Sequence, residues 1–131
     1  MEMTRSGRLV PPANDRAPSG LSDLLPSEIL ALPKVEVPVS GATGFSLADD
    51  EKQVVFFVFD EGVSFPDHAH CEQRGVVVSG EMVLEIEGAT NLYQAGDRYV
   101  VPENVHHRTT FTQQTVLIDM SDATDRFPVR R

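Results

Sequence analysis

Between residues 35 and 120 the chain is a series of short apolar stretches, separated by turns rich in glycine, proline and aspartate. No long stretch has the 3.6-residue periodicity of an amphipathic helix. Many short strands at this spacing are typical of an all-β sandwich or barrel. The expected strands cover residues 35–39, 43–47, 53–59, 75–79, 82–87, 92–94, 98–101, 107–112 and 115–120.

The apolar patterns of these segments indicate how they are arranged. Residues 53–59 (QVVFFVF) are apolar on both faces, as expected of a strand between two layers. Residues 82–87 alternate between apolar and acidic, so one face of that strand is dry, and with the preceding strand they predict a hairpin around Gly80. Pro38 places the first strand at a sheet edge, and residues 60–66 are expected to be a loop.

The N-terminal region differs from the rest of the chain. Residues 1–20 are rich in proline and small polar residues without a periodic apolar pattern, which predicts a flexible tail. Residues 21–32 (LSDLLPSEILAL) predict a short helical segment whose apolar side chains cover the main body or a neighbouring subunit. We therefore expect a single domain over residues 21–131, with a barrel core at about residues 50–120.

Composition excludes some partners and compartments. The chain has 11 basic and 20 acidic residues, a net charge of −9, which argues against nucleic acid or an anionic membrane as partner. A single cysteine, Cys71, excludes an intrachain disulfide and suits a reducing cytosol; we expect it to be a packed or surface thiol. With no apolar signal-peptide core or spanning segment in the sequence, a cytoplasmic location is expected.

The strongest chemical signal is a pair of histidines, His68 and His70. Residues two apart on an extended strand point to the same face, so both imidazoles are expected to project in one direction. Neutral imidazole is a good ligand for zinc, iron, nickel or copper. Gln73 follows three residues later and His107 lies near the end of the chain, and the activity is expected where these side chains meet.

The spacing around these histidines resembles the two signature motifs of the cupin superfamily. The first motif is a glycine, five residues, His-x-His, an acid or amide ligand, six residues and a glycine; the second is a glycine, five residues, a proline, and a histidine five beyond it. The matching positions are Gly62, His68, His70, Gln73 and Gly80 in the first motif, and Gly96, Pro102 and His107 in the second. The resemblance covers about residues 50–120.

The cupin resemblance implies a double-stranded β-helix, the jelly-roll barrel of that family, with one divalent transition metal inside it. Iron, manganese, nickel, zinc and copper are all compatible with such a site. The implied ligands are His68, His70, Gln73 and His107. His106 should point away from the site, because it is adjacent to His107.

The sequence also departs from the family pattern. Only two residues separate His70 from Gln73, where the family usually has three or four between these ligands. The distance back from Gly80 favours Gln73, while strand parity from His70 favours Glu72, which stays open as a rival ligand. In the second motif a usual glycine is replaced by Asn104, and the terminal asparagine is replaced by Phe111.

Three functions are compatible with these residues. The first is a metal-dependent enzyme that acts on a small organic molecule by dioxygenase, isomerase or lyase chemistry. The second is a non-catalytic protein that binds or senses a small ligand or a metal, and the third is a metal-free barrel that binds sugars or acids. The metal ligands favour the first two, and His106, Glu72 and Tyr99 are candidate proton-transfer groups if they reach the pocket.

Two further expectations concern the pocket wall and the assembly. Phe56 or Phe57, Met82, Tyr99 and Phe111 could line an apolar pocket beside the metal, although plain core positions are the more common role of such residues. A homodimer is expected from the family and from the apolar segments 21–32 and 35–39, which could pair across subunits.

Overall fold

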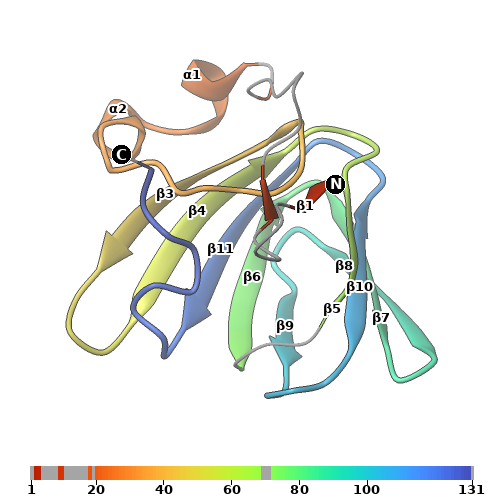
Figure 1. Ribbon diagram of the computed structural model, residues 1–131. Helices are drawn as coiled ribbons and strands as arrows, with labels where there is room; N and C mark the ends of the chain where they lie inside the picture. The colour runs from red at the N-terminus through yellow and green to blue at the C-terminus, as the bar shows by residue number, and fades with distance from the viewer. Residues whose placement is uncertain (1, 4–8, 11–17, 19, 69–71, 131) are drawn as a thin grey trace.

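The apolar strands form two antiparallel sheets that pack face to face in the computed structural model (Figure 1). The structure describes residues 2–3, 9–10, 18, 20–68 and 72–130, and only the backbone at 2–3, 9–10 and 66–68. The five-stranded sheet has the order β3 (Ala42–Ala48), β4 (Gln53–Phe59), β11 (Thr115–Ser121), β6 (Gln73–Ser79), β9 (Arg98–Val101). The four-stranded sheet has the order β5 (Ser64–His68), β10 (His107–Phe111), β7 (Glu81–Ile86), β8 (Ala89–Gln94). This confirms the predicted jelly-roll barrel.

Strand β4 explains why the sheets and the N-terminal helices stay together. Its inward residues, including Phe57 and Phe59, join the main core between the two sheets. Its outward residue Val58 joins a second buried cluster with Leu25, Phe45 and Val116. Apolar side chains of helices α1 (Leu21–Leu24) and α2 (Ser27–Leu30) pack against this second cluster, so the predicted helical segment packs on its own sheet. Figure 1 shows the two helices at one end of this sheet.

Within the predicted tail, only a short pairing and two single positions are described. Strands β1 (Glu2–Met3) and β2 (Leu9–Val10) pair antiparallel, and Pro18 is buried. The predicted tail otherwise lies outside the described residues, so its flexibility and the domain boundary at residue 21 stay predictions. No helix in the described part of the chain is long and apolar enough to cross a membrane.

The prediction of an edge strand at residues 35–39 was wrong. The backbone there makes only isolated bridges, Lys34 with Phe45 and Val35 with Val129. The alternation was nevertheless informative, because Val35, Val37 and Val39 are all buried in the main core. The period-two pattern therefore reflects the burial of alternate side chains and not continuous pairing of the backbone with a neighbouring strand.

Two connections also differ from the predictions. The expected loop at residues 60–66 contains the start of β5, where Pro66 is tolerated because β5 is an edge strand. The expected hairpin around Gly80 does not form, because β6 and β7 belong to different sheets. At Gly80 the chain turns with φ of 89°, and a Cβ there would overlap the Gln114 carbonyl oxygen and Thr115, so the crossing requires glycine.

Candidate functional site

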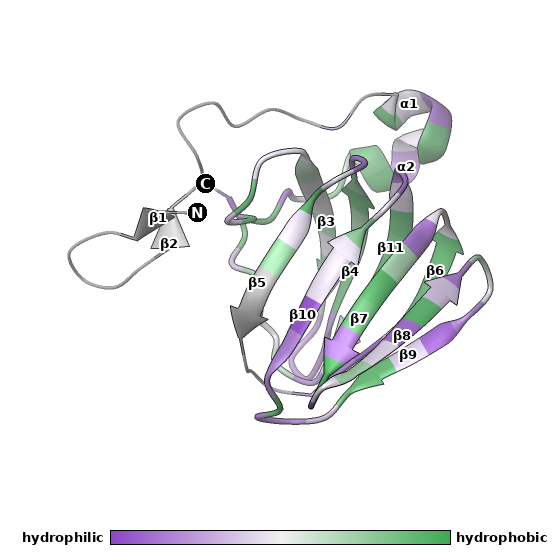
Figure 2. Ribbon diagram, turned by 90° about the vertical axis from the view of Figure 1, so that its right-hand side faces the viewer, coloured by the Kyte–Doolittle hydropathy of each residue, from purple (hydrophilic) through white to green (hydrophobic). Residues whose placement is uncertain are grey.

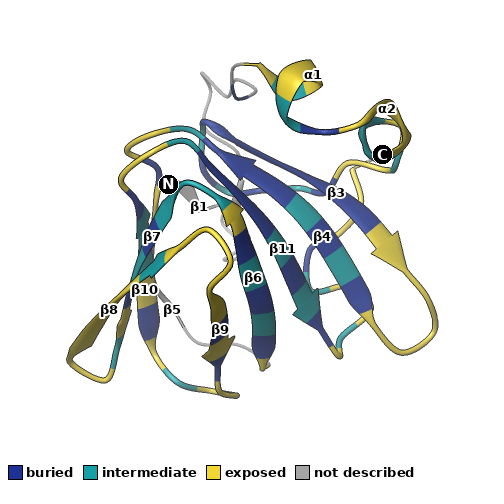
Figure 3. Cartoon of the chain, turned by 180° about the vertical axis from the view of Figure 1, so that it is seen from behind, coloured by how far each residue is buried: buried dark blue, intermediate teal, exposed yellow. Residues whose placement is uncertain are grey.

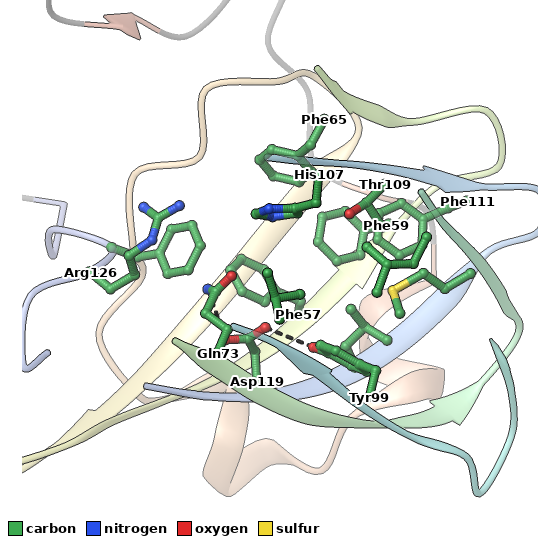
Figure 4. Close-up of a pocket in the computed structure, with 15 residues that line it drawn as sticks. Phe57, Phe59, Phe65, Gln73, Tyr99, His107, Thr109, Phe111, Asp119 and Arg126 are labelled. Atoms are coloured by element: carbon green, nitrogen blue, oxygen red, sulfur yellow. Dashed lines mark hydrogen bonds between the residues drawn. The ribbon is translucent and has the colours of Figure 1, made fainter. Parts of the chain in front are cut away.

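A narrow pocket of about 50 Å³ lies between the two sheets, which is room for a few water molecules. Most of its wall is aromatic or aliphatic, and the polar side chains of Gln73, His107 and Arg126 lie toward one end (Figure 4). The aromatic wall is formed by Phe57, Phe59, Phe65, Phe111 and Phe127, and the polar lining by Gln73, Tyr99, His107, Thr109, Asp119 and Arg126. The predicted pocket residues Phe57, Met82, Tyr99 and Phe111 all line it, whereas Phe56 packs on the outer cluster.

Strand register creates the polar group on the five-stranded sheet. Asp119 of β11, Gly75 of β6 and Tyr99 of β9 are successive partners across three strands, so they share one face of the sheet. Because Gly75 has no side chain, the Tyr99 ring can lie across it and reach Asp119. The Tyr99 hydroxyl donates a hydrogen bond of 2.7 Å to Oδ2 of Asp119, both residues being buried.

Asp119 is a buried carboxyl held by two donors. Its Oδ1 accepts a hydrogen bond of 3.1 Å from Nε2 of Gln73, and its Oδ2 accepts the bond from Tyr99. Burial raises the pKa of Asp119 to about 7, although the Tyr99 bond, the positive charge of Arg126 and the Gln73 bond each favour its ionised form. Burial and the neighbouring Asp119 also raise the pKa of Tyr99, so its phenol stays protonated.

Gln73 is oriented by its bond to Asp119. The side chain is only 6% exposed and lines the pocket. Because the carboxamide nitrogen donates to Asp119, the carboxamide oxygen is left facing the His107 side of the pocket (Figure 4). An amide oxygen fixed in this way is a suitable ligand for a divalent metal.

His107 lies on the opposite sheet and is oriented in a similar way. It is 4% exposed, begins β10, and projects into the pocket (Figure 4). Its Nδ1 lies 3.0 Å from the carbonyl oxygen of Val105. A carbonyl only accepts, so Nδ1 carries the proton and Nε2 has the lone pair; metal-binding histidines are commonly held in this tautomer.

The other two predicted ligands are only partly within the description. His68 ends β5, and its backbone is the register partner of His107 across the β5–β10 pair. His70 lies outside the described residues, as does Cys71. Among the residues that are described, no cluster of three or more histidine, cysteine, aspartate or glutamate side chains could hold a metal ion. The described residues Gln73 and His107 fit a metal by donor chemistry and orientation, and the complete set stays a prediction.

The rival residues lie elsewhere. Glu72 is exposed and accepts a hydrogen bond of 3.0 Å from Arg74, so it is turned away from the pocket that Gln73 lines. His106 is exposed and lines a groove on the outside of the four-stranded sheet with Glu85, Glu87 and other residues. Of the three candidate proton-transfer groups, only Tyr99 lines the pocket.

Sequence reasoning missed Asp119 and Arg126. Asp119 lies in the apolar segment TVLIDMS and shares strand parity with the buried Thr115 and Leu117. An acidic residue at an inward position of a core strand is a signal that strand parity could have revealed. Arg126 follows the last strand, in a segment without periodicity, and no local pattern indicates that it reaches the pocket.

Comparisons with known proteins agree with this architecture. A model of the Cupin domain family matches residues 55–120, half of the chain. A search of curated proteins found no match. An RmlC-like cupin from Shewanella frigidimarina NCIMB 400 is 30% identical, with a TM-score of 0.63 over 71% of this chain and 86% of that one. KdgF from a Halomonas species is 26% identical, with a TM-score of 0.59 over 65% of this chain and 82% of that one.

A third structure extends the likeness of the fold. A cupin superfamily protein from Desulfitobacterium hafniense DCB-2 is 17% identical, with a TM-score of 0.60 over 87% of this chain and 94% of that one. The family model begins in β4 and ends in β11, so it spans the strands that carry both Gln73 and His107. The chain therefore belongs to the cupin superfamily.

Proposed function

We propose that this cupin binds one divalent transition metal in its barrel and acts there on a small organic molecule. The proposed ligands are His68, His70, Gln73 and His107. A metal held by them would supply Lewis acidity, an activated water or a site for dioxygen, depending on its identity. Dioxygenase, isomerase and lyase chemistry are all compatible with such a centre. We propose a cytoplasmic location, because a chain with a single cysteine forms no intrachain disulfide and suits a reducing compartment.

One observation supports this proposal: the two proposed ligands whose side chains are described, Gln73 and His107, are each held by a hydrogen bond on the side away from the proposed metal. Asp119 holds the nitrogen of Gln73, and the Val105 carbonyl holds Nδ1 of His107. Both residues line the same pocket from opposite sheets. Outer hydrogen bonds of this kind fix the orientation of ligands in metal sites. A histidine and a glutamine that only fill the core would not need to be oriented toward the same pocket.

The pocket also supports catalysis over storage of a metal. The Tyr99 phenol, the Asp119 carboxyl and the Arg126 guanidinium all line it, in a wall that is otherwise mostly apolar. Such a wall excludes bulk water and strengthens the electrostatic effect of each polar group on a bound molecule. The alternative is a cupin that binds a small ligand or metal without turnover; oxygen-uptake and product assays on small phenols, diketones and thiols separate the two.

Metal retention tests the ligand set. Protein purified without chelator is expected to contain about one transition metal ion per chain by elemental analysis. His107→Ala should weaken retention by more than the roughly 10- to 100-fold that loss of an outer partner causes, because a direct ligand is removed. His106→Ala is the matched control, since it removes the adjacent, exposed histidine, and it should leave the metal content unchanged.

Two results would contradict the metal proposal. The first is wild-type protein that contains no metal after growth in media supplemented with each candidate metal. This result would favour the function of a metal-free barrel that binds sugars or acids. Equal metal content in His107→Ala and His106→Ala would show that His107 is not a ligand.

We also propose that the protein is a homodimer, formed through the outer face of the five-stranded sheet. The two segments first considered for pairing, 21–32 and 35–39, pack within the chain itself. The outer face, seen in Figure 3, instead carries a row of register partners across all five strands. The row is Leu47, Val54, Met120, Arg74 and Val100.

Two features make this row suitable for a second copy of the chain. Leu47 is 55% exposed and Val100 is 53% exposed, although both are large apolar residues. Arg74 in the middle is paired with Glu72 and Asp122 at 3.0 and 3.2 Å, which compensates its charge. A row of this kind can pack against the same row of a second copy across a two-fold axis, which is the usual symmetry of a homodimer.

Solution mass tests the homodimer. Light scattering after size-exclusion chromatography should give twice the 14.4 kDa of one chain for the wild type and one chain mass for Leu47→Glu/Val100→Glu. The carboxylates would be buried without partners in the interface, which disfavours association. Leu92→Glu is the matched control, because Leu92 is also 55% exposed but lies on the other sheet. A monomeric wild type, or dissociation by Leu92→Glu alone, would refute this interface.

A further inference from the structure

Arg126 brings a positive charge to a pocket that is otherwise mostly apolar. It lies in the C-terminal segment after β11 and lines the pocket together with Gln73 and His107. Figure 4 shows these three side chains toward one end of the pocket, with Phe111 and Tyr99 toward the other. The guanidinium carbon lies 4.6 Å from the centroid of the Phe127 ring, a cation–π distance. An arginine at this place is notable in a chain with a net charge of −9.

The segment that carries Arg126 is fixed to the barrel by a buried glutamine. Gln53 is 1% exposed, and its Nε2 donates to the Phe127 carbonyl oxygen at 2.8 Å. Its Oε1 accepts from the Phe127 backbone nitrogen at 2.9 Å, so both backbone groups of Phe127 are bound by one side chain. Next along the chain, the Pro128 carbonyl accepts from the backbone nitrogen of Glu36 at 2.8 Å. The residue after Arg126 is therefore held in place, which limits where the guanidinium can lie.

The chemistry of the wall determines which ligands this guanidinium suits. An anion that enters an apolar pocket loses its hydration, and Asp119, when ionised, would repel it. The planar guanidinium offsets this cost through charge-assisted, bidentate hydrogen bonds, whose geometry matches a carboxylate. The narrow cavity favours a small, flat group over a large one.

We propose that Arg126 is a specificity-determining residue that binds the carboxylate of a small organic acid, whose hydrocarbon part lies toward Phe59 and Phe111. This inference rests on the proposed function, because it names the substrate class of the same pocket. It places the acid's carboxylate at the end of the pocket where Gln73 and His107 lie, so that the neighbouring carbon atoms are close to those ligands.

Binding of butyrate and of its neutral analogue butyramide tests the inference without turnover. Metal is first removed with a chelating resin, because soluble carboxylate chelators would compete for the site and a bound metal could hold the carboxylate itself. Calorimetry or ligand-observed NMR should show that the wild type binds butyrate about tenfold or more tightly than butyramide. Arg126→Gln should abolish this preference. Arg130→Gln, which removes an exposed charge from the same segment, is the matched control and should preserve it.

The outcomes separate this inference from the metal proposal. A wild type that does not prefer butyrate, a preference that survives Arg126→Gln, or equally tight binding of inorganic phosphate would each overturn it, whatever the metal content. A carboxylate preference in a protein that takes up no metal would support the role of Arg126 and refute the metal proposal.

If circular dichroism shows that Arg126→Gln does not fold, Arg126→Lys is used in its place. Lysine lacks the bidentate geometry of arginine, so butyrate binding should weaken by roughly threefold or more. Unchanged affinity for butyrate would overturn the inference.

Discussion

Replacing Gly75 by alanine is expected to lower the free energy of unfolding by about 3 kcal/mol, near the upper end for overpacking one methyl group into a core. A Cβ at this position would overlap the phenol of Tyr99, with the ring carbon Cε1 only 2.6 Å away. The ring cannot retreat without losing its 2.7 Å bond to Asp119. Urea denaturation of the wild type and of Gly75→Ala, both without metal, measures the difference.

A double mutant shows whether Tyr99 is the cause. Leucine at position 99 lacks the ring atoms that the new methyl group would meet, so Gly75→Ala should cost much less in a Tyr99→Leu background than in the wild type. The coupling energy between the two sites is expected to be roughly 2 kcal/mol, within the range found for residues in contact. Equal costs in both backgrounds would mean that the glycine is needed for another reason.

The second large effect concerns Asp119 and pH. The pKa of this carboxyl is raised from 3.8 to about 7 in the folded protein, mainly by burial. Between these values the folded protein binds more protons than the unfolded chain, so the contribution of Asp119 to stability is fully present below pH 4 and is lost as the pH rises through about 7. The loss amounts to roughly 4 kcal/mol over this interval. Asp119→Asn cannot ionise and should not show it.

The measurement is the difference in unfolding free energy between wild type and Asp119→Asn, without metal, at several pH values from 4 to 8. This difference removes the contributions of exposed acids such as Asp122 and Glu81, whose lowered pKa values act in the opposite direction. The wild type should lose stability relative to the variant as the pH rises. Parallel curves for the two proteins would show that Asp119 ionises as easily in the fold as in the unfolded chain.

Asp119 and Gln73 illustrate what a strand pattern can predict about a site. Gln73 was identified by its spacing to Gly80, and the structure places it in the pocket while Glu72 is exposed. Strand parity could have identified Asp119 as an inward residue, but it could not have identified the residues that Asp119 contacts. The approach of Asp119, Gly75 and Tyr99 depends on the registers of three strands that are far apart in the chain. Register is set by long-range pairing and leaves no mark in a local window.

The order of strands was beyond local reasoning for a similar reason. Strands β6 and β7 are adjacent in sequence and separated by a turn residue, which is the usual signature of a hairpin. In the barrel they belong to different sheets, because the chain turns at Gly80 against Gln114 and Thr115. Only the packing of that corner distinguishes a hairpin from a crossing.

The sequence by itself determined the class of fold, most strand positions, the inward residues of β7, and the cupin family, because alternation, turn residues and motif spacing are local properties of a chain. The tertiary structure alone decided that Asp119 orients Gln73, that the Val105 carbonyl selects the tautomer of His107, and that Gln53 holds the segment carrying Arg126 at the pocket. Asp119 and Gln73 are 46 positions apart in the chain, and Gln53 and Phe127 are 74 positions apart, so each of these two pairs meets only through long-range packing. That packing is set by the whole core at once, so no single stretch of sequence encodes it.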